Sequence, residues 1–330
     1  MDLKGTLSSY TKMTEKEIAR YTARKPDYLY EPIRDLFSRG GKRLRPALCM
    51  ISCEAVGGKP RDGLSVGAVI EMVHNFTLIH DDIADRSELR RGKPCLHHKY
   101  GLGLAVNSGD GLFSLAYEAL SDALEKLESK KGKRVLKTLS AQITRVCEGQ
   151  ALDIGWVENR RWDLTEKDYF DMIRRKTGAL MAASCEVGAI VGGATENEIE
   201  ALRDFGMNMG VSFQIHDDVL NLRADAKKYG KEIGGDINEG KRTLIIIYTL
   251  AACKPEEKAR LIHILDKERN SQDEIREAIG IINKYGSVER AAAVAKEIVD
   301  SGKDGLKVLK KSKAKETLLA IADYMVERDL

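Results

Sequence analysis

Residues 71–94 read EMVHNFTLIHDDIADRSELRRGKP, and this stretch indicates both the fold and the chemistry of the chain. Apolar residues recur at helical intervals through its first half without Gly or Pro, which predicts a buried helix. Asp81, Asp82 and Asp85 follow at the end of that helix, where the last carbonyl groups already carry partial negative charge. Asp81 and Asp85 are four residues apart and share one face of the helix. Such a carboxylate pair suits Mg²⁺, although a solvated helix end neutralised by the neighbouring arginines is the plain alternative.

A second acidic helix supports the metal interpretation. Residues 213–222 read FQIHDDVLNL, which repeats the Ile-His-Asp-Asp pattern of residues 79–82. Its polar residues, spaced to line one face of the helix, are Gln214, Asp217, Asp218 and Asn221. The two acidic helices lie about 136 residues apart and can meet only inside one bundle, in which facing helices build metal sites. We therefore expect residues 1–330 to form a single domain.

The composition predicts an all-α protein. Only 6 of the 330 residues are proline and 6% are aromatic, and long runs rich in Ala, Leu, Glu, Lys and Arg favour helix. No segment alternates between apolar and polar residues as half-buried strands do. The net charge of +3, without an arginine-rich tract, argues against a nucleic-acid partner.

Neither a transmembrane segment nor secretion is expected. The longest apolar tracts, residues 178–194 and 243–253, fall short of the roughly 20 apolar residues that span a bilayer. Residues 1–25 are studded with charges and lack the apolar core of a signal peptide. The six cysteines are scattered without the spacing of zinc ligands. We expect a protein of the reducing cytoplasm.

Basic segments accompany the acidic helices. Clustered cations occur in the turns GGKRLRP (40–46) and ELRRGKP (88–94), before Thr177, and in a glycine-rich loop with Lys231 and Lys241. Arginine grips phosphate through two hydrogen bonds and lysine adds a point charge, although each turn alone is equally an ordinary basic surface. Together with the apolar residues beside the acids, these turns describe a site for a diphosphate head with a hydrocarbon tail.

In this order, the motifs resemble those of the trans-isoprenyl diphosphate synthases of the farnesyl and geranylgeranyl type, a family of prenyltransferases. The resemblance covers roughly residues 40–245, from GGKRLRP through DDIAD (81–85) and RRGKP (90–94) to FQ…DD (213–218). It implies the isoprenoid synthase fold, a single large helical bundle with a central apolar cavity. It also implies a homodimer that condenses isopentenyl diphosphate head-to-tail with an allylic diphosphate.

The roles of the family's residues carry over to the matching positions. The resemblance places the diphosphate of isopentenyl diphosphate on four side chains, Lys42, Arg45, His74 and Arg91. It assigns about three Mg²⁺ ions, which clamp the allylic diphosphate, to Asp81, Asp85 and Asp217. The cations that help to hold this diphosphate are Arg90, Lys176, Lys231 and Lys241. Thr177 and Gln214, together with Lys176, are placed near the allylic carbon, where they stabilise developing positive charge.

Two further positions bear on this assignment. The second acidic motif of the family often ends in Asp, whereas this chain has Asn221, which supplies no charge to a metal. In the family, the residues four and five positions before the first Asp form the floor of the tail cavity. Here these are Thr77 and Phe76, and a single aromatic at the fifth position resembles archaeal geranylgeranyl diphosphate synthases. We expect a C20 product, with C15 and C25 as alternatives.

Two other classes of protein compete with this interpretation. A terpene cyclase has a similar bundle and acidic motif, but it binds one diphosphate and would leave Lys42, Arg45, His74 and Arg91 without a role. A non-catalytic partner subunit of a prenyl synthase is the second competitor. Such subunits tend to lose the first acidic motif, which is intact here.

Overall fold

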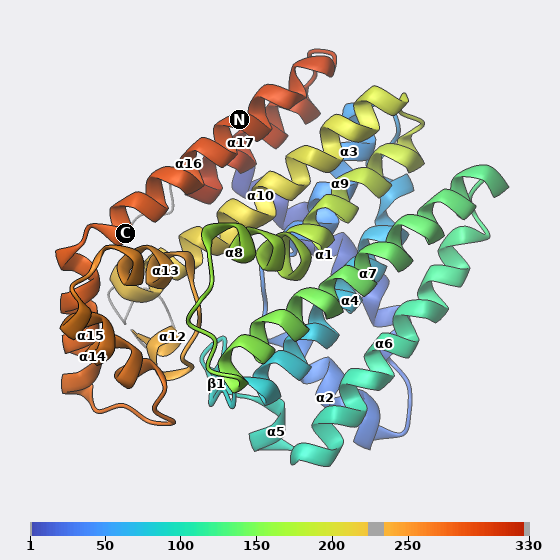
Figure 1. The fold of residues 1–330 in the computed structure, drawn as a ribbon. Helices are drawn as coiled ribbons and strands as arrows, with labels where there is room; N and C mark the ends of the chain where they lie inside the picture. Colours follow the sequence, from blue (N-terminus) through green and yellow to red (C-terminus); the bar gives the residue numbers. More distant parts are fainter. Residues whose placement is uncertain (1, 224–233, 327–330) are drawn as a thin grey trace.

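The computed structural model describes residues 2–223 and 234–326, which fold almost entirely into helices (Figure 1). The first half contains α1 (Leu3–Thr22), α2 (Asp27–Ser38), α3 (Leu44–Ala55), the 3-10 turn η1 (Pro60–Gly63), α4 (Leu64–Ala84), the strands β1 (Leu89–Arg90) and β2 (Lys93–Pro94), α5 (Leu96–Lys99), α6 (Leu102–Leu124) and α7 (Ser129–Glu158). The two strands pair antiparallel. The expected all-α class is confirmed, with this hairpin as the one sheet in the described part of the chain.

The second half continues the helical pattern. It contains α8 (Glu166–Ile173), the π-helical turn η2 (Arg174–Gly178), α9 (Ala179–Gly192), α10 (Glu196–Arg223), α12 (Gly235–Asn238), α13 (Leu244–Ala252), α14 (Pro255–Leu265), α15 (Gln272–Lys284), α16 (Ser287–Gly305), the 3-10 turn η3 (Leu306–Val308) and α17 (Lys313–Val326). None of the described helices is long and apolar enough to cross a membrane.

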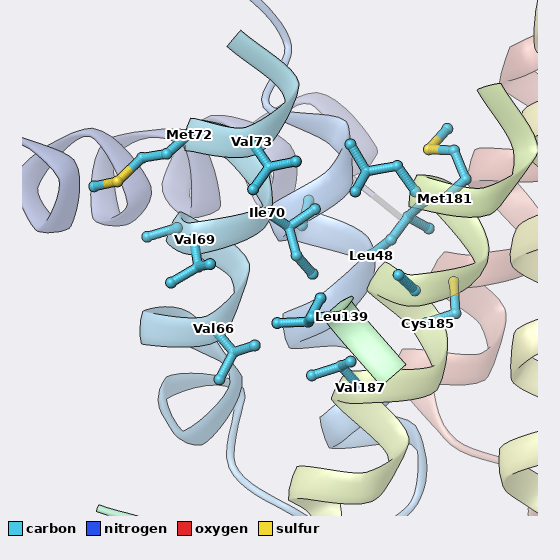
Figure 2. Packing of buried hydrophobic residues seen from close by; sticks show 14 of the residues in the cluster. Leu48, Val66, Val69, Ile70, Met72, Val73, Leu139, Met181, Cys185 and Val187 are labelled. Carbon is cyan, nitrogen blue, oxygen red and sulfur yellow. The ribbon is translucent and has the colours of Figure 1, made fainter. Parts of the chain in front are cut away.

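Helix α4 lies at the centre of the larger hydrophobic core, in contact with α3, α6 and α9. In Figure 2, Ile70 and Val73 point from α4 toward α3 and α9, whereas Met72 points the other way. All three side chains are at most 2% exposed, and burying an aliphatic side chain of this size contributes roughly 1.5–3 kcal/mol each. Because α4 is apolar on nearly every side, its polar C-terminal end is held rigidly where it leaves the core.

Helix α10 joins this core to a second one. Its first half, with Leu202 and Phe205, packs in the same core as α4, and its second half, with Ile215 and Val219, packs against α13 and α16 in the other. Figure 1 shows α13, α14 and α15 gathered at one side of the bundle and α6 at the other. The second acidic motif therefore lies in the part of α10 that is packed in the second core.

The sequence also predicts a break between helices at residues 129–133, a polar loop at residues 156–163 and a helix start at Thr165. The first two boundaries are wrong. The break expected at residues 129–133 lies at 125–128, and Ser129 already begins α7. The loop expected from Trp156 onward begins after Glu158, because Trp156 is buried and its packing in the second core extends the helix. The expected helix start at Thr165 is confirmed, since its side chain accepts a hydrogen bond from the backbone N–H of Asp168.

Candidate active site

The three acids at the end of α4 point in different directions. Asp82 is 3% exposed and accepts a hydrogen bond from Arg90 Nε at 2.8 Å, which ties the β1–β2 hairpin to the helix. The alternative of neutralisation by a neighbouring arginine therefore applies to this one acid. Asp81 and Asp85 lie half-buried on another face of the helix end, and their partners come from distant helices.

Asp81 is held by α7 and the π-helical turn. Gln150 Nε2 donates to its carboxylate at 2.7 Å, and Lys176 Nζ lies 3.4 Å from the same oxygen. Lys176 also donates to Asp153 at 2.5 Å. Burial alone would raise the pKa of Asp81, but Lys176 and the more distant Lys241 outweigh it and lower the pKa. Asp81 is therefore ionised at neutral pH.

Asp85 meets the loop before α13. Lys241 Nζ lies 3.1 Å from its carboxylate and 2.5 Å from Glu239. Burial raises the pKa of Asp85, and Lys241 only partly offsets this burial and the repulsion from Asp81 and Glu239. This end of α4 therefore holds more negative charge than its lysines neutralise, which favours a bound cation.

The same loop reaches the second acidic motif. Asp236 lies 4.0 Å from Lys241 Nζ, and its backbone N–H donates to Asn221 Oδ1 at 3.2 Å. Residues 236–241 thus connect the ends of α4 and α10, and Asn221 has a structural partner. Asp217 lies half-buried on α10, one turn before Asn221.

A chain of hydrogen bonds fixes the remaining polar residues of α10. Thr177 Oγ1 donates to Gln214 Oε1 at 3.3 Å, and Gln214 Nε2 donates to Asp218 at 2.9 Å. Tyr169 also donates its hydroxyl to Asp218, at 3.1 Å. Because the Gln214 amide nitrogen donates to Asp218, its carbonyl oxygen points toward Thr177. The partial negative charge of this oxygen is available to a nearby cation.

Two glycines shape the π-helical turn that presents Lys176 and Thr177. A Cβ at position 149 of α7 would lie 2.2 Å from Lys176 N, and a Cβ at position 210 of α10 would lie 2.7 Å from Gly178 Cα. The backbones of α7 and α10 thus contact the turn closely on two sides, which only glycine allows at these two positions. π-helical turns within α-helices are frequent at functional sites because they redirect side chains.

The oxygens at this end of the bundle fit Mg²⁺. Across residues 2–223 and 234–326, no three His, Cys, Asp or Glu side chains gather closely enough to enclose a metal by themselves. Mg²⁺ takes one or two carboxylates and completes its shell with waters and substrate phosphates. Asp81 and Asp85 supply such hard oxygen ligands in a negatively charged setting, so the residues present suit this ion.

A second group of cations gathers near the start of α3, and within the described residues Lys42, Arg45 and Arg91 form no ion pair with a carboxylate. Gly40, Gly41 and Arg43 have φ angles of 77°, 136° and 44°, a left-handed path that suits the two glycines. Arg43 turns inward and donates to Glu71 at 3.0 Å, so it serves the fold. Lys42, by contrast, is exposed.

Arg45, His74 and Arg91 complete this cationic group. Arg45 Nε is buried and has no hydrogen-bond partner within the described residues, and burial lowers the pKa of Arg45 to about 10. Burial, then Arg45 and Arg91, lower the pKa of His74 well below its ordinary value. Arg91 donates to Gly40 O, and its guanidinium lies 3.0 Å from where a Cβ at Gly41 would stand. This concentration of positive charge, together with the unpaired N–H donor of Arg45, favours the binding of an anion.

The positions expected to limit chain length lie just before the acids. Phe76 is 8% exposed and packs on Phe113 of α6 with ring centroids 4.7 Å apart, and Tyr117 lies behind at 5.0 Å from Phe113. Thr77 turns its hydroxyl back to His74 O at 2.7 Å. A column of aromatic rings therefore lies between α4 and α6 on the apolar side of the acids.

Several residues of this site were not predicted from the sequence, among them Gln150, Asp153, Tyr169, Asp236 and Glu239. Gln150 and Asp153 are three residues apart on α7 and share a face, which is the one signal that the sequence offered for them. The assignments to Lys42, Arg45, Arg90, Arg91, Asp217 and the other expected site residues remain predictions, and Lys231 lies outside the described residues.

Comparisons with known proteins agree with this geometry. Residues 26–282 match the polyprenyl synthetase family. A short chain isoprenyl diphosphate synthase of Methanothermobacter thermautotrophicus is 42% identical over 100% of this chain and 99% of its own length. A geranylgeranyl diphosphate synthase of Sulfolobus acidocaldarius is 42% identical over 84% of this chain and 83% of its own length.

A solved structure agrees as well. The geranylgeranyl pyrophosphate synthetase of Pyrococcus horikoshii superposes with a TM-score of 0.93 at 38% identity, covering 100% of both chains. Members of the family depend on magnesium in general and act on isopentenyl and allylic diphosphates. The chain belongs to the polyprenyl synthetase family and is a prenyltransferase.

Proposed function

We propose that this protein is a short-chain trans-prenyltransferase that condenses isopentenyl diphosphate with allylic diphosphates and releases geranylgeranyl diphosphate. The observation that carries the proposal is the separation of two sites around α4. One pairs Asp81 and Asp85 with Lys176 and Lys241. The other crowds Lys42, Arg45, His74 and Arg91 without a carboxylate in ion-pair contact, within the described residues. Two anions of different kinds, one metal-bound and one bound directly, suit this arrangement.

The first site prepares the allylic diphosphate to leave. Bound Mg²⁺ supplies Lewis-acid neutralisation of the diphosphate charge. Asp81, Asp85 and Asp217 would hold about three such ions, and Lys176, Lys241, Arg90 and Lys231 would bind the remaining oxygens. The carbon–oxygen bond then breaks, and the diphosphate keeps the electron pair. Lys176 is fixed by Asp153, so its charge is in place before the bond lengthens.

The second site holds the nucleophile. Lys42, Arg45, His74 and Arg91 bind the diphosphate of isopentenyl diphosphate and present its double bond to the allylic carbon. The hydrogen bond from Thr177 to Gln214 holds their two oxygens beside each other. In this proposal the partial negative charge of both oxygens stabilises the developing positive charge. A new carbon–carbon bond forms, and loss of a proton to the departed diphosphate restores the double bond.

The product length follows from the aromatic column. Phe76 and Thr77 lie on α4 about one turn before Asp81, and Phe76 packs on Phe113, so we expect a growing hydrocarbon tail to meet the ring of Phe76 before that of Phe113. The archaeal relatives named for geranylgeranyl diphosphate support a C20 product. We assign the chain-length limit to Phe76.

We further infer a single-domain homodimer in the cytoplasm. Leu102, Val106 and Tyr117 expose apolar surface along α6, which a second copy of the chain would cover. The cysteines are free thiols, as expected in a reducing compartment. Helix α10 contributes to both cores, which supports one cooperative unit; the central apolar cavity is proposed from the family resemblance alone.

Product analysis tests the proposal. Purified protein with Mg²⁺ and radiolabelled isopentenyl diphosphate is incubated separately with dimethylallyl, geranyl and farnesyl diphosphates, and the dephosphorylated products are separated by chain length. We expect all three primers to give mainly a C20 alcohol. A C15 or C25 product would refute the chain-length assignment, and no labelled product with any primer would refute the condensation itself.

A further inference from the structure

Lys42 belongs to the loop of residues 40–43 before α3, here called the anion loop, and is held by α17. Lys42 Nζ donates to the hydroxyl of Tyr324 on α17 at 2.7 Å and lies 4.7 Å from the centre of its ring. Thr11 of α1 donates to Lys42 O at the longer distance of 3.4 Å. Helices α1 and α17 therefore both reach the proposed site for isopentenyl diphosphate.

Lys42 is exposed on a glycine-rich loop, where a lysine side chain without a partner samples many conformations. Its side chain has four rotatable bonds, and fixing them opposes binding. The preceding Gly40 and Gly41 follow left-handed backbone, so the loop itself gives little restraint to the side chain. A partner from α17 removes this freedom before the substrate arrives.

The chemistry of the partner also matters. A carboxylate would fix Lys42 but would cancel the charge that a diphosphate needs. Within the described residues, no Asp or Glu forms an ion pair with Lys42, and the tyrosine hydroxyl is neutral. An ammonium group has three N–H donors, so one bond to Tyr324 leaves two donors and the full positive charge for phosphate oxygens.

Tyr324 is itself rigidly placed. Helix α17 packs on α3, the helix that follows the anion loop, and Leu318, Ile321 and Met325 on α17 are fully buried. The neighbouring Asp323 forms an ion pair with Lys303 of α16 at 2.7 Å. The loop and its tyrosine thus stand on one packed surface, and the distance between them is set by helix packing.

We propose that Tyr324 is a positioning residue for isopentenyl diphosphate, acting by holding the ammonium group of Lys42 toward the diphosphate. The inference rests on the proposed function and assigns to α17 a part in recognising the second substrate. Tyr324 does not touch the substrate in this account, and its effect passes entirely through Lys42.

The test compares the two substrates of one reaction in four variants of the full chain. Tyr324→Phe removes the hydroxyl and keeps the ring, Lys42→Ala removes its target, and the double variant combines them. Asp323→Asn is the matched control, because it weakens a contact of the same helix that does not reach Lys42. KM is measured for isopentenyl diphosphate and for farnesyl diphosphate, with a thermal melt of each variant.

We expect Tyr324→Phe to raise KM for isopentenyl diphosphate about threefold to tenfold, the effect of losing one partly exposed hydrogen bond to a charged group. KM for farnesyl diphosphate should change less than about twofold, as should both constants of Asp323→Asn. In the Lys42→Ala background, Tyr324→Phe should have no further effect, since the group it positions is gone.

The outcomes separate the inference from the function on which it rests. If Lys42→Ala raises KM for isopentenyl diphosphate and Tyr324→Phe does not, the inference is overturned and the function stands. Equal increases for both substrates, or an undiminished increase in the Lys42→Ala background, would show a merely structural role and would also overturn it. If Lys42→Ala leaves KM unchanged, the assignment of Lys42 in the proposed function fails and the inference fails with it.

Discussion

Replacing Gly149 by alanine should displace the turn that carries Lys176 and Thr177. The added Cβ would lie 2.2 Å from Lys176 N, 2.7 Å from Lys176 Cα and 2.8 Å from Arg175 C. All three atoms belong to the backbone, so no flexible side chain can yield. Ordinary contact begins near 3.4 Å, and relief of the closest contact therefore needs a displacement of about 1.2 Å between α7 and the turn.

A displacement of this size is large for a reacting site. The Lys176 ammonium lies 2.5 Å from Asp153 and 3.4 Å from Asp81, and these contacts lengthen if the turn moves away from α7. A misplacement of about 1 Å costs on the order of 100-fold in rate, or about 2.7 kcal/mol of transition-state stabilisation. Overpacking should also lower the free energy of unfolding by about 1–3 kcal/mol.

The helix offers its own control. Gly155 also lies on α7, and a Cβ there would have nothing within 4 Å. Gly155→Ala should therefore retain activity and stabilise the helix by about 0.5–1 kcal/mol. The assay is kcat/KM with saturating isopentenyl diphosphate and varied farnesyl diphosphate, together with thermal unfolding followed by circular dichroism.

The expected result is a loss of about 100-fold for Gly149→Ala, with Gly155→Ala near the wild type. Activity of Gly149→Ala within about threefold of the control, in a protein that folds, would show that the close approach of α7 does not place Lys176 and Thr177. If Gly149→Ala unfolds at the assay temperature, it is measured at a lower temperature in the presence of diphosphate, which stabilises the folded state, with the same expected loss.

Three further predictions concern α4. Asp81→Asn should lower kcat by at least about 100-fold, because it removes a metal-binding charge and leaves Lys176 short of one partner; near-normal turnover at saturating Mg²⁺ would refute the metal role. Phe76→Ala should shift the product mixture toward C25, since the tail then meets the ring of Phe113 instead of Phe76, and an unchanged distribution by chromatography would refute the role of Phe76 in chain length. His74 has a folded pKa well below its ordinary value, owing to burial and then to Arg45 and Arg91. The unfolded chain therefore binds a proton near pH 6.5 that the folded chain does not, and stability is lost as the pH falls from about 6.5 toward the folded pKa. His74→Asn should remove this part of the acid destabilisation, and parallel melting curves of the two proteins from pH 8 to pH 5 would contradict the prediction.

The helical class could be predicted because its signals lie in residues that are close together in the sequence. The apolar residues of the stretch 72–83 recur at helical intervals without Gly or Pro, and this stretch forms the second half of α4. The capping pair of Thr165 and Asp168 likewise predicted where α8 begins. Both signals reside in neighbouring residues, so no knowledge of the rest of the chain was needed.

Other features depend on packing and escaped prediction. The residues of the segment Arg174–Gly178 carry no sign of a π-helix, and this form arises where the segment packs between Gly149 and Gly210, which lie on two other helices. Arg90 had two plausible partners, a ligand or a nearby acid, and the hairpin placed it on Asp82.

Some residues of the candidate site could likewise be predicted from the sequence, and others could not. Asp81 and Asp85 were visible because charges at a helix end are conspicuous. Gln150 was not, because a lone glutamine on a polar helix carries no sign of the carboxylate that it contacts across the bundle. The partner of Lys42 lies on the last helix, beyond any local pattern.

The dependence of one substrate on the other tests the central claim most directly. Farnesyl diphosphate is incubated with the protein and Mg²⁺, with and without isopentenyl diphosphate, and the loss of both substrates is followed with the diphosphate released. We expect no loss of farnesyl diphosphate alone and, with both substrates present, their consumption in a 1:1 ratio with one diphosphate and one C20 product formed. Consumption of farnesyl diphosphate without isopentenyl diphosphate would contradict this expectation and indicate a cyclase.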